Sequence, residues 1–272
     1  MSIPAEWLRP DWHAAGVGAL MTTRAGGSSA TPFDAMNLQN GGGDAPEDVS
    51  RNRTLLAEAI GRTPVFVSQV HGTSVVRLTR ADVVPGAPIH TADASITTDP
   101  NIACAIQVAD CLPVLFAAPE GRGVGAAHAG WRGLASGVLE ATIDRLCEAA
   151  ACEPNELQAW IGAGIGPTRF QVGADVVEAF GGSSAHEPTN AAAHGAAQSS
   201  GDVSKARFVP DAPGKWLANL PLLARDRLRS AGVDAVFGGT WCTVSEPSRF
   251  FSFRRDRVTG RMAAVIWLDG RR

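Results

Sequence analysis

The chain has 272 residues, of which 45% are hydrophobic, with 24 lysines and arginines against 27 aspartates and glutamates. This apolar fraction can supply one full core, so we expect a single globular domain over residues 1–272. The formal net charge of −3 argues against electrostatic capture of nucleic acid or of an anionic membrane surface.

Membrane and secretion signals are missing from the sequence pattern. No apolar stretch approaches the roughly 20 residues that a membrane-spanning helix needs, and the first residues lack the basic and apolar regions of a signal peptide. The five cysteines are odd in number and show no disulfide framework. We therefore expect a cytoplasmic protein without a membrane partner. The sequence does not indicate an oligomeric state.

The first part of the chain predicts strands that end in glycine-rich or histidine-containing turns. A strand over 16–23 ends at Arg24 and the glycines after it, a turn that could approach an anion or serve only as a flexible connection. A helix is predicted over 45–60, with acidic residues in its first turn. Strands over 64–70 and 74–78 follow, and His71 lies in the turn between them.

The central stretch 91–139 predicts the strands around which the chain is organised. A buried strand over 102–108 is expected to continue over 114–118 after a bend at Pro113, which places Cys111 at the bend. A strand over 124–127 brings His128 to the start of a helix predicted over 134–149. Strand ends converge on ligand-binding crevices in α/β proteins, and a helix start offers backbone N–H groups to an anion.

The last part of the chain predicts further strands and two helices. Strands are expected over 157–162, 233–238, 241–244, 249–256 and 262–268, and helices over 174–180 and 216–231. The segment 181–205 is rich in small and polar residues and is predicted to be a flexible insertion. Together these patterns predict an α+β fold, a single domain with mixed β-sheets flanked by helices.

His71, Cys111 and His128 form the candidate metal site. Two imidazoles and a thiolate suit zinc and leave it an open fourth position. Two alternatives remain open. One is a Cys–His nucleophile pair, and the other is a copper site completed by a methionine, for which the candidates are Met21, Met36 and Met262. The chain has only six histidines, too few for a multi-copper cluster. The motifs of zinc deaminases, zincins and serine hydrolases are absent.

Five motifs resemble those of the YfiH-like family, and the resemblance spans nearly the whole chain: SQVHG at 68–72, ADA at 92–94, VADCLP at 108–113, AHAGWRG at 127–133 and FSFRRD at 251–256. That family carries the label polyphenol oxidoreductase or laccase. It is also described as purine nucleoside phosphorylase with adenosine deaminase and methylthioadenosine phosphorylase activity.

The resemblance implies that His71, Cys111 and His128 bind zinc, with copper as the alternative, and that Arg24 and Asn37 belong to the same pocket. The chain departs from the family pattern after Ile-Gly-Pro, where relatives often have cysteines and this sequence has a threonine and an arginine at 168–169. Any role of those cysteines does not carry over to this chain.

The expected function is that of a metal-dependent purine nucleoside phosphorylase acting on adenosine, inosine, guanosine and methylthioadenosine, with adenosine deaminase activity. Phosphate would be held by Arg24 and an arginine of the pair at 254–255, and Asp110 is the candidate general acid or base. The alternatives are a copper-dependent phenol oxidoreductase, a hydrolase that edits peptidoglycan precursors, and a non-enzymatic metal-dependent interaction module. The candidate substrate-binding residues are Arg24, Asn37, Gln69, Arg132, Arg254 and Arg255.

Overall fold

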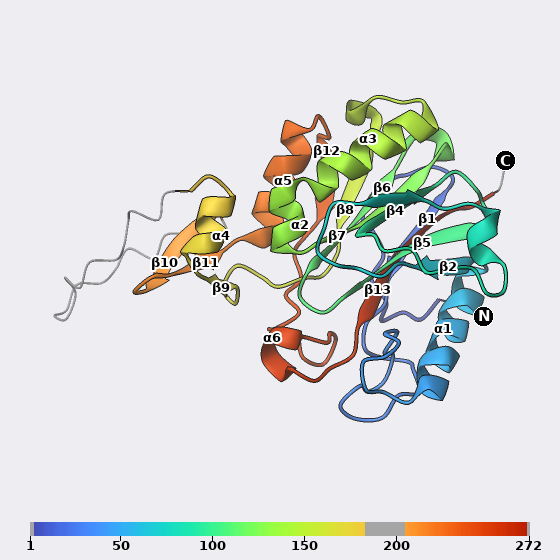
Figure 1. Cartoon of the computed structure of the whole chain (residues 1–272), viewed down its shortest axis with the longest axis horizontal. Helices are drawn as coiled ribbons and strands as arrows, with labels where there is room; N and C mark the ends of the chain where they lie inside the picture. Colours follow the sequence, from blue (N-terminus) through green and yellow to red (C-terminus); the bar gives the residue numbers. More distant parts are fainter. Residues whose placement is uncertain (1–2, 183–204, 271–272) are drawn as a thin grey trace.

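Two mixed β-sheets packed face to face form the centre of the structure (Figure 1). In this computed structural model, which describes residues 3–182 and 205–270, the four-stranded sheet has the order β1 (Val17–Met21), β13 (Met262–Leu268), β5 (Ile102–Val108), β2 (Thr63–Phe66). The six-stranded sheet has the order β12 (Ala235–Gly238), β8 (Gln158–Ile161), β6 (Leu112–Ala117), β7 (Val124–Ala129), β4 (Ala94–Thr97), β3 (Val75–Arg77). Each sheet contains parallel and antiparallel pairs.

Alternating side chains of β5 explain why this strand is apolar on both faces. Ile102, Cys104 and Ile106 pack between the two sheets, while Ala103 and Ala105 face the opposite side. Successive residues of a strand point to opposite faces of the sheet, so a strand that is covered on both sides must be apolar throughout. The run at 102–108 is such a strand.

Helices cover the outer face of each sheet, so the molecule has four layers (Figure 1). Helix α1 (Pro46–Ile60) packs on the four-stranded sheet through Leu56 and Ile60. Helices α2 (Trp131–Ser136), α3 (Val138–Ala150) and α5 (Leu220–Ser230) pack on the six-stranded sheet. This arrangement confirms the predicted α+β fold with mixed sheets flanked by helices.

A small third sheet extends to one side of the molecule (Figure 1). It has the order β10 (Phe208–Ala212), β11 (Lys215–Ala218), β9 (Gln171–Val172), beside helix α4 (Ala174–Ala179). The remaining helices are α6 (Phe253–Asp256) and the 3-10 helices η1 (Arg80–Val83), η2 (Pro119–Gly121) and η3 (Pro154–Glu156). The predicted insertion at 181–205 lies, except for its ends, outside the described residues. Within the described part of the chain, no helix is long and apolar enough to cross a membrane.

The structure corrects two predictions in the central stretch. The strand expected over 114–118 does not continue β5, because β5 and β6 belong to different sheets. The chain turns between them at Asp110, whose φ of 102° breaks the extended run. The helix expected over 134–149 is two helices, because Gly137 adopts a left-handed φ of 100° between them.

Three further predictions near the C-terminus are wrong. The segment from Trp216 begins as β11, and the helix starts only after Asn219, whose side chain accepts a hydrogen bond from the Leu222 N–H. Residues 241–244 contain an isolated β-bridge from Cys242 to Gly164 and then a turn, in place of a strand. The expected strand at 249–256 contains α6, because Ser252 caps a helix start by accepting a hydrogen bond from the Arg255 N–H. Its alternating aromatic pattern was therefore misleading.

Gly137 provides a test of the helix break. Replacing it with alanine places a Cβ in the left-handed region, which costs an L-residue about 1–2 kcal/mol. Neighbouring atoms leave room for the Cβ, the nearest lying 3.7 Å away, so strain alone is expected to lower the free energy of unfolding by about that amount. Urea denaturation would measure it. Gly137→Asn should lose less, because asparagine tolerates this conformation, and equal stability of all three proteins would contradict this account.

Candidate metal centre

His71 and Cys111 lie on segments that cross from one sheet to the other. His71 lies between β2 and β3, and Cys111 follows β5 and precedes β6. Both crossings contain a non-glycine residue with positive φ, His71 at 62° and Asp110 at 102°. His128 lies near the end of β7, opposite Pro113 of β6. The two crossings therefore bring a histidine and a cysteine to the same sheet edge as His128.

The three side chains converge as a metal site requires. Their ligand atoms all lie within 4.8 Å of one another, and Cys111 Sγ lies 3.7 Å from His71 Nε2. Tetrahedral zinc with bonds of about 2.0–2.3 Å holds such ligands about 3.5 Å apart. Among the described residues, the candidate ligand group consists of these three side chains, and His71 is the exposed one. The donor set thus fits a metal ion with one open coordination position.

A buried carboxylate that was not predicted to belong to the site, Asp93, orients two of the ligands. Its side chain is fully buried and contacts His128 Nδ1 at 2.8 Å. It also accepts hydrogen bonds from the backbone N–H groups of Val70, His71 and Gly72. When Nδ1–H of His128 donates to Asp93, Nε2 is left with a lone pair for a metal. Asp93 therefore sets both the tautomer of His128 and the position of the His71 loop.

The charges of the site favour a thiolate at Cys111. Burial by itself would raise the pKa of the Cys111 thiol, but hydrogen bonds and charge interactions with His128 and His71 outweigh it and lower the pKa to about 6. Burial would likewise lower the pKa of His128, yet its contacts with Asp93 and Cys111 raise that pKa to about 9. A thiolate is the form of cysteine that binds metal or attacks carbon.

Gly130 has no side chain, and the space that a Cβ would take is occupied by the candidate ligands His71 and Cys111. A Cβ at this position would lie 2.7 Å from His71 Cδ2 and 3.0 Å from Cys111 Sγ. Its φ of −64° is open to any residue, so the requirement for glycine is one of space, not of backbone conformation. The glycine after His128 in the sequence motif is therefore part of the metal site.

The metal ligands open into a pocket of about 780 Å³. Its walls come from the end of β2, the η1 segment, the end of β5 and the start of α6. Arg53 of α1 and Arg261 before β13 line it together with His71, Cys111 and His128. This volume is in the range of small-molecule sites.

Gln69 is the predicted substrate-binding residue that lines this pocket. Its side chain is held by both backbone groups of Gln107, donating to the carbonyl and accepting from the N–H. Asn37 does not line the pocket, but its Oδ1 accepts from the Arg261 N–H. Arg132 also lies outside the lining, with its guanidinium over the Trp131 ring.

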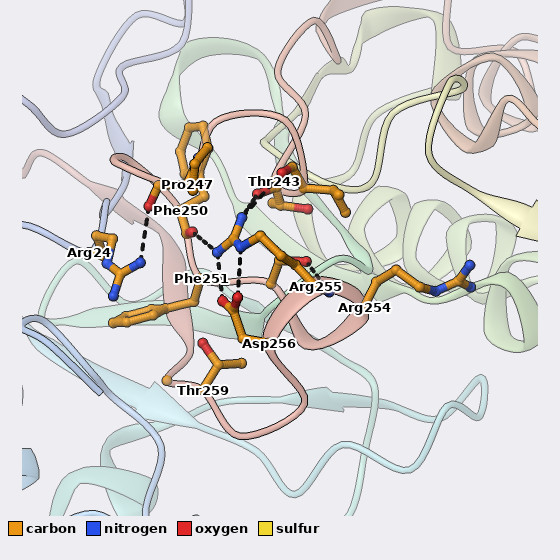
Figure 2. A network of polar contacts seen from close by, with 12 residues as sticks. Arg24, Thr243, Pro247, Phe250, Phe251, Arg254, Arg255, Asp256 and Thr259 are labelled. Atoms are coloured by element: carbon orange, nitrogen blue, oxygen red, sulfur yellow. Dashed lines mark hydrogen bonds and ion pairs between the residues drawn. The ribbon is translucent and has the colours of Figure 1, made fainter. Parts of the chain in front are cut away.

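The other predicted arginines hold the structure together, as Figure 2 shows. Arg24 donates to Pro247 O and Asp34 O and pairs with the Asp34 carboxylate. Arg255 pairs with Asp256 and donates to the carbonyl groups of residues 243, 244 and 250. Arg254 points away from this network and donates to the carbonyl of residue 171 (Figure 2). None of these arginines lines the pocket.

Asp110, the predicted general acid or base, is also engaged away from the pocket. Its carboxylate accepts from Thr243 Oγ1 at 2.6 Å and from the Arg254 N–H at 2.7 Å. The methionines considered as copper ligands, Met21, Met36 and Met262, are fully buried and do not line the pocket. A trigonal copper site with an axial methionine therefore has no support from this geometry.

The chain is similar to a laccase family and to proteins named purine nucleoside phosphorylase. Residues 18–269 match the family described as "Multi-copper polyphenol oxidoreductase laccase". A purine nucleoside phosphorylase of Pseudomonas aeruginosa is 46% identical over 97% of this chain and 98% of its own length. The purine nucleoside phosphorylase YfiH of Escherichia coli is 43% identical over 98% of each chain.

Solved structures agree with this relationship over the whole chain. The crystal structure of a Neisseria meningitidis protein, 41% identical, has a TM-score of 0.83 and covers 97% of this chain and 100% of its own. YlmD from Geobacillus stearothermophilus, 31% identical, has a TM-score of 0.84 and covers 98% of each chain.

Replacing Gly130 with alanine is expected to weaken metal binding at least about tenfold, because the new Cβ displaces two ligands whose geometry zinc constrains. Stability of the metal-free protein should change by less than about 1 kcal/mol, since φ is unstrained. Chelator competition and thermal denaturation would measure both. Gly42→Ala, where the nearest atoms belong to the flexible Gln39 side chain, serves as the control. Equal metal affinity in both variants would show that Gly130 is not needed for space.

Replacing Asp93 with asparagine is expected to lower metal affinity by about 10- to 100-fold, the usual effect of removing a partner of a ligating histidine. The amide keeps a single acceptor oxygen for the four donors that now bind the carboxylate. The matched control is Asp82→Asn, because Asp82 lines the pocket but pairs with His90. The idea fails if the two variants bind metal equally well.

Proposed function

The chain belongs to the multi-copper polyphenol oxidoreductase laccase family, which includes the YfiH proteins, and from this premise we propose that it is a metal-dependent purine nucleoside phosphorylase. Membership confirms the family resemblance seen in the sequence motifs. The observation that carries the proposal is that a metal-ligand triad opens into a pocket of about 780 Å³. Relatives named purine nucleoside phosphorylase cover nearly the whole chain.

We propose zinc as the metal, bound by His71, Cys111 and His128. The fit rests on two nitrogen donors and one thiolate, with Asp93 fixing His128 and with one side left open. When bound, zinc supplies a Lewis acid that polarises a substrate oxygen. Asp93 keeps the ligating imidazole in one tautomer, and Gly130 keeps the ligands unobstructed.

In the proposed reaction an oxygen of phosphate forms a bond to the anomeric carbon of the ribose while the bond from that carbon to the base nitrogen breaks. The products are ribose 1-phosphate and the free purine, which takes up a proton. Apolar side chains that are exposed at the pocket support a flat base there: Ile89 is 70% exposed, Val84 54% and Phe253 47%. Apolar side chains of this kind can pack against a nucleobase.

The finer activities belong to the same proposal. Adenosine, inosine, guanosine and methylthioadenosine share the ribose and purine that the pocket would hold, and adenosine deamination would exchange an amino group for a water oxygen at the same site. A cytoplasmic location is also proposed, since all five cysteines are free thiols, as reducing compartments keep them.

The test is a panel of these nucleosides with and without phosphate, on protein purified without added metal and analysed for its metal content. We expect stoichiometric zinc, and release of base and ribose 1-phosphate only when phosphate is present. Cys111→Ala should lose activity at least about 100-fold, because two imidazoles alone hold zinc poorly. Cys152→Ala, a half-buried cysteine outside the pocket, should keep full activity.

Two outcomes would overturn the proposal. Base release that does not depend on phosphate would make the protein a nucleoside hydrolase. Full copper occupancy with oxidation of phenols, and no cleavage of any nucleoside, would support the copper-dependent oxidoreductase instead.

A further inference from the structure

Two arginines of the pocket form no salt bridge with any described residue. Arg53 and Arg261 are both half-buried and both line the pocket that contains the metal ligands. Among the described residues, neither pairs with a carboxylate, whereas Arg24 pairs with Asp34 and Arg255 with Asp256. The only lining carboxylate among these residues, Asp82, is bonded to His90 at 2.6 Å.

The guanidinium of Arg53 is held in place but keeps hydrogen-bond donors free. Its Nε donates to Leu38 O at 3.0 Å, and its carbon lies 4.2 Å from the centre of the Phe66 ring. Both Nη atoms lack a hydrogen-bond partner in the described part of the chain. Because the hydrogen bond and the aromatic ring fix the plane of the guanidinium, its two Nη atoms can donate together to one ligand.

Arg261 is arranged in the same way. Its Nη1 donates to the carbonyls of Thr259 and Gly260, and its guanidinium carbon lies 5.7 Å from the centre of the Phe253 ring. Its Nε and Nη2 have no hydrogen-bond partner among the residues described here. Both arginines thus combine a backbone anchor, an aromatic neighbour and free donors.

The two arginines are joined through one backbone segment. Leu38 O accepts from Arg53, and Leu38 N–H donates to Arg261 O at 3.1 Å. Asn37 Oδ1 accepts from the Arg261 N–H at 2.9 Å. This segment links the Arg53 side chain to the Arg261 backbone, and it gives Asn37 a part in placing Arg261.

Burial without a carboxylate is unfavourable for a charged group. Loss of solvent lowers the pKa of Arg53 to about 10. It also lowers the pKa of Arg261, although the negative charges of Asp110 and Cys111 oppose that shift. A buried charge is ordinarily paired or bound to an ion. Free donors and an unpaired positive charge beside a metal site are the features of an anion site, and forked guanidinium groups match the oxygens of phosphate.

We propose that Arg53 and Arg261 form the phosphate subsite of the pocket, in place of Arg24, Arg254 and Arg255. The role of phosphate as a co-substrate rests on the proposed function. The binding of phosphate to these two arginines does not depend on that function. The arginines expected from the sequence to bind phosphate have their donors engaged by backbone carbonyls and carboxylates in the network of Figure 2 or lie outside the pocket.

The test is calorimetric binding of inorganic phosphate to the metal-loaded protein, in the wild type and in Arg53→Lys and Arg261→Gln. Each variant is expected to bind phosphate at least about tenfold more weakly, equivalent to about 1.4 kcal/mol, and to raise the KM for phosphate by a similar factor. Metal content, Tm and the KM for inosine should stay near the wild-type values. Lysine keeps the charge of Arg53, so a loss there reports the planar fork.

The matched control is Arg257→Gln, because Arg257 lies 5.9 Å from the centre of the same Phe253 ring without lining the pocket. It should bind phosphate as the wild type does. The proposal is overturned if both pocket variants keep wild-type affinity, or if a folded Arg24→Lys protein loses phosphate binding while they retain it.

The experiments can refute the phosphate subsite and the proposed function independently of each other. Phosphate binding that depends on Arg53 and Arg261, in a protein that cleaves no nucleoside, would keep the subsite and refute the phosphorylase. Phosphate-dependent cleavage with an unchanged KM for phosphate in both variants would keep the phosphorylase and refute the subsite.

Discussion

The geometry of the candidate metal centre depends on the hydrogen bonds of the Asp93 carboxylate. This carboxylate is fully buried and accepts from the backbone of residues 70–72 while it contacts His128. An isolated buried carboxylate would cost several kcal/mol, so these partners are needed to keep it charged. They are the same groups that place two ligands. The same hydrogen bonds therefore stabilise the buried charge of Asp93 and position the candidate ligands.

The two stacked sheets explain why the ligands meet. Two chain crossings, at 67–74 and at 109–111, pass between the four-stranded and the six-stranded sheet at the same edge. Each crossing needs a residue with positive φ, and each carries a ligand. A packed interior holds the floor of the pocket rigid, and the exposed His71 leaves one side open toward the pocket. Rigid ligands with an open side suit chemistry better than a purely structural metal.

Local pattern predicted the elements whose environment is uniform along their length. The strands at 102–108 and 262–268 and the helix ending at Ile60 were expected within a residue or two, because they are buried on both faces or amphipathic throughout. Prediction failed where a single residue changed the local conformation. Gly137 split one helix, and Ser252 started another inside a segment that alternates like a strand.

The sequence by itself predicted the candidate metal ligands, because His71, Cys111 and His128 are donors of suitable softness at the ends of expected strands, within motifs that resemble one family. The tertiary structure alone decided which arginines face the pocket. Arg24 and Arg255 are engaged by carbonyl and carboxylate groups, while Arg53 and Arg261 line the pocket and form no salt bridge within the described part of the chain. A partner of a guanidinium group can lie far away in the chain, as Pro247 does for Arg24. The availability of the group to a ligand therefore depends on packing.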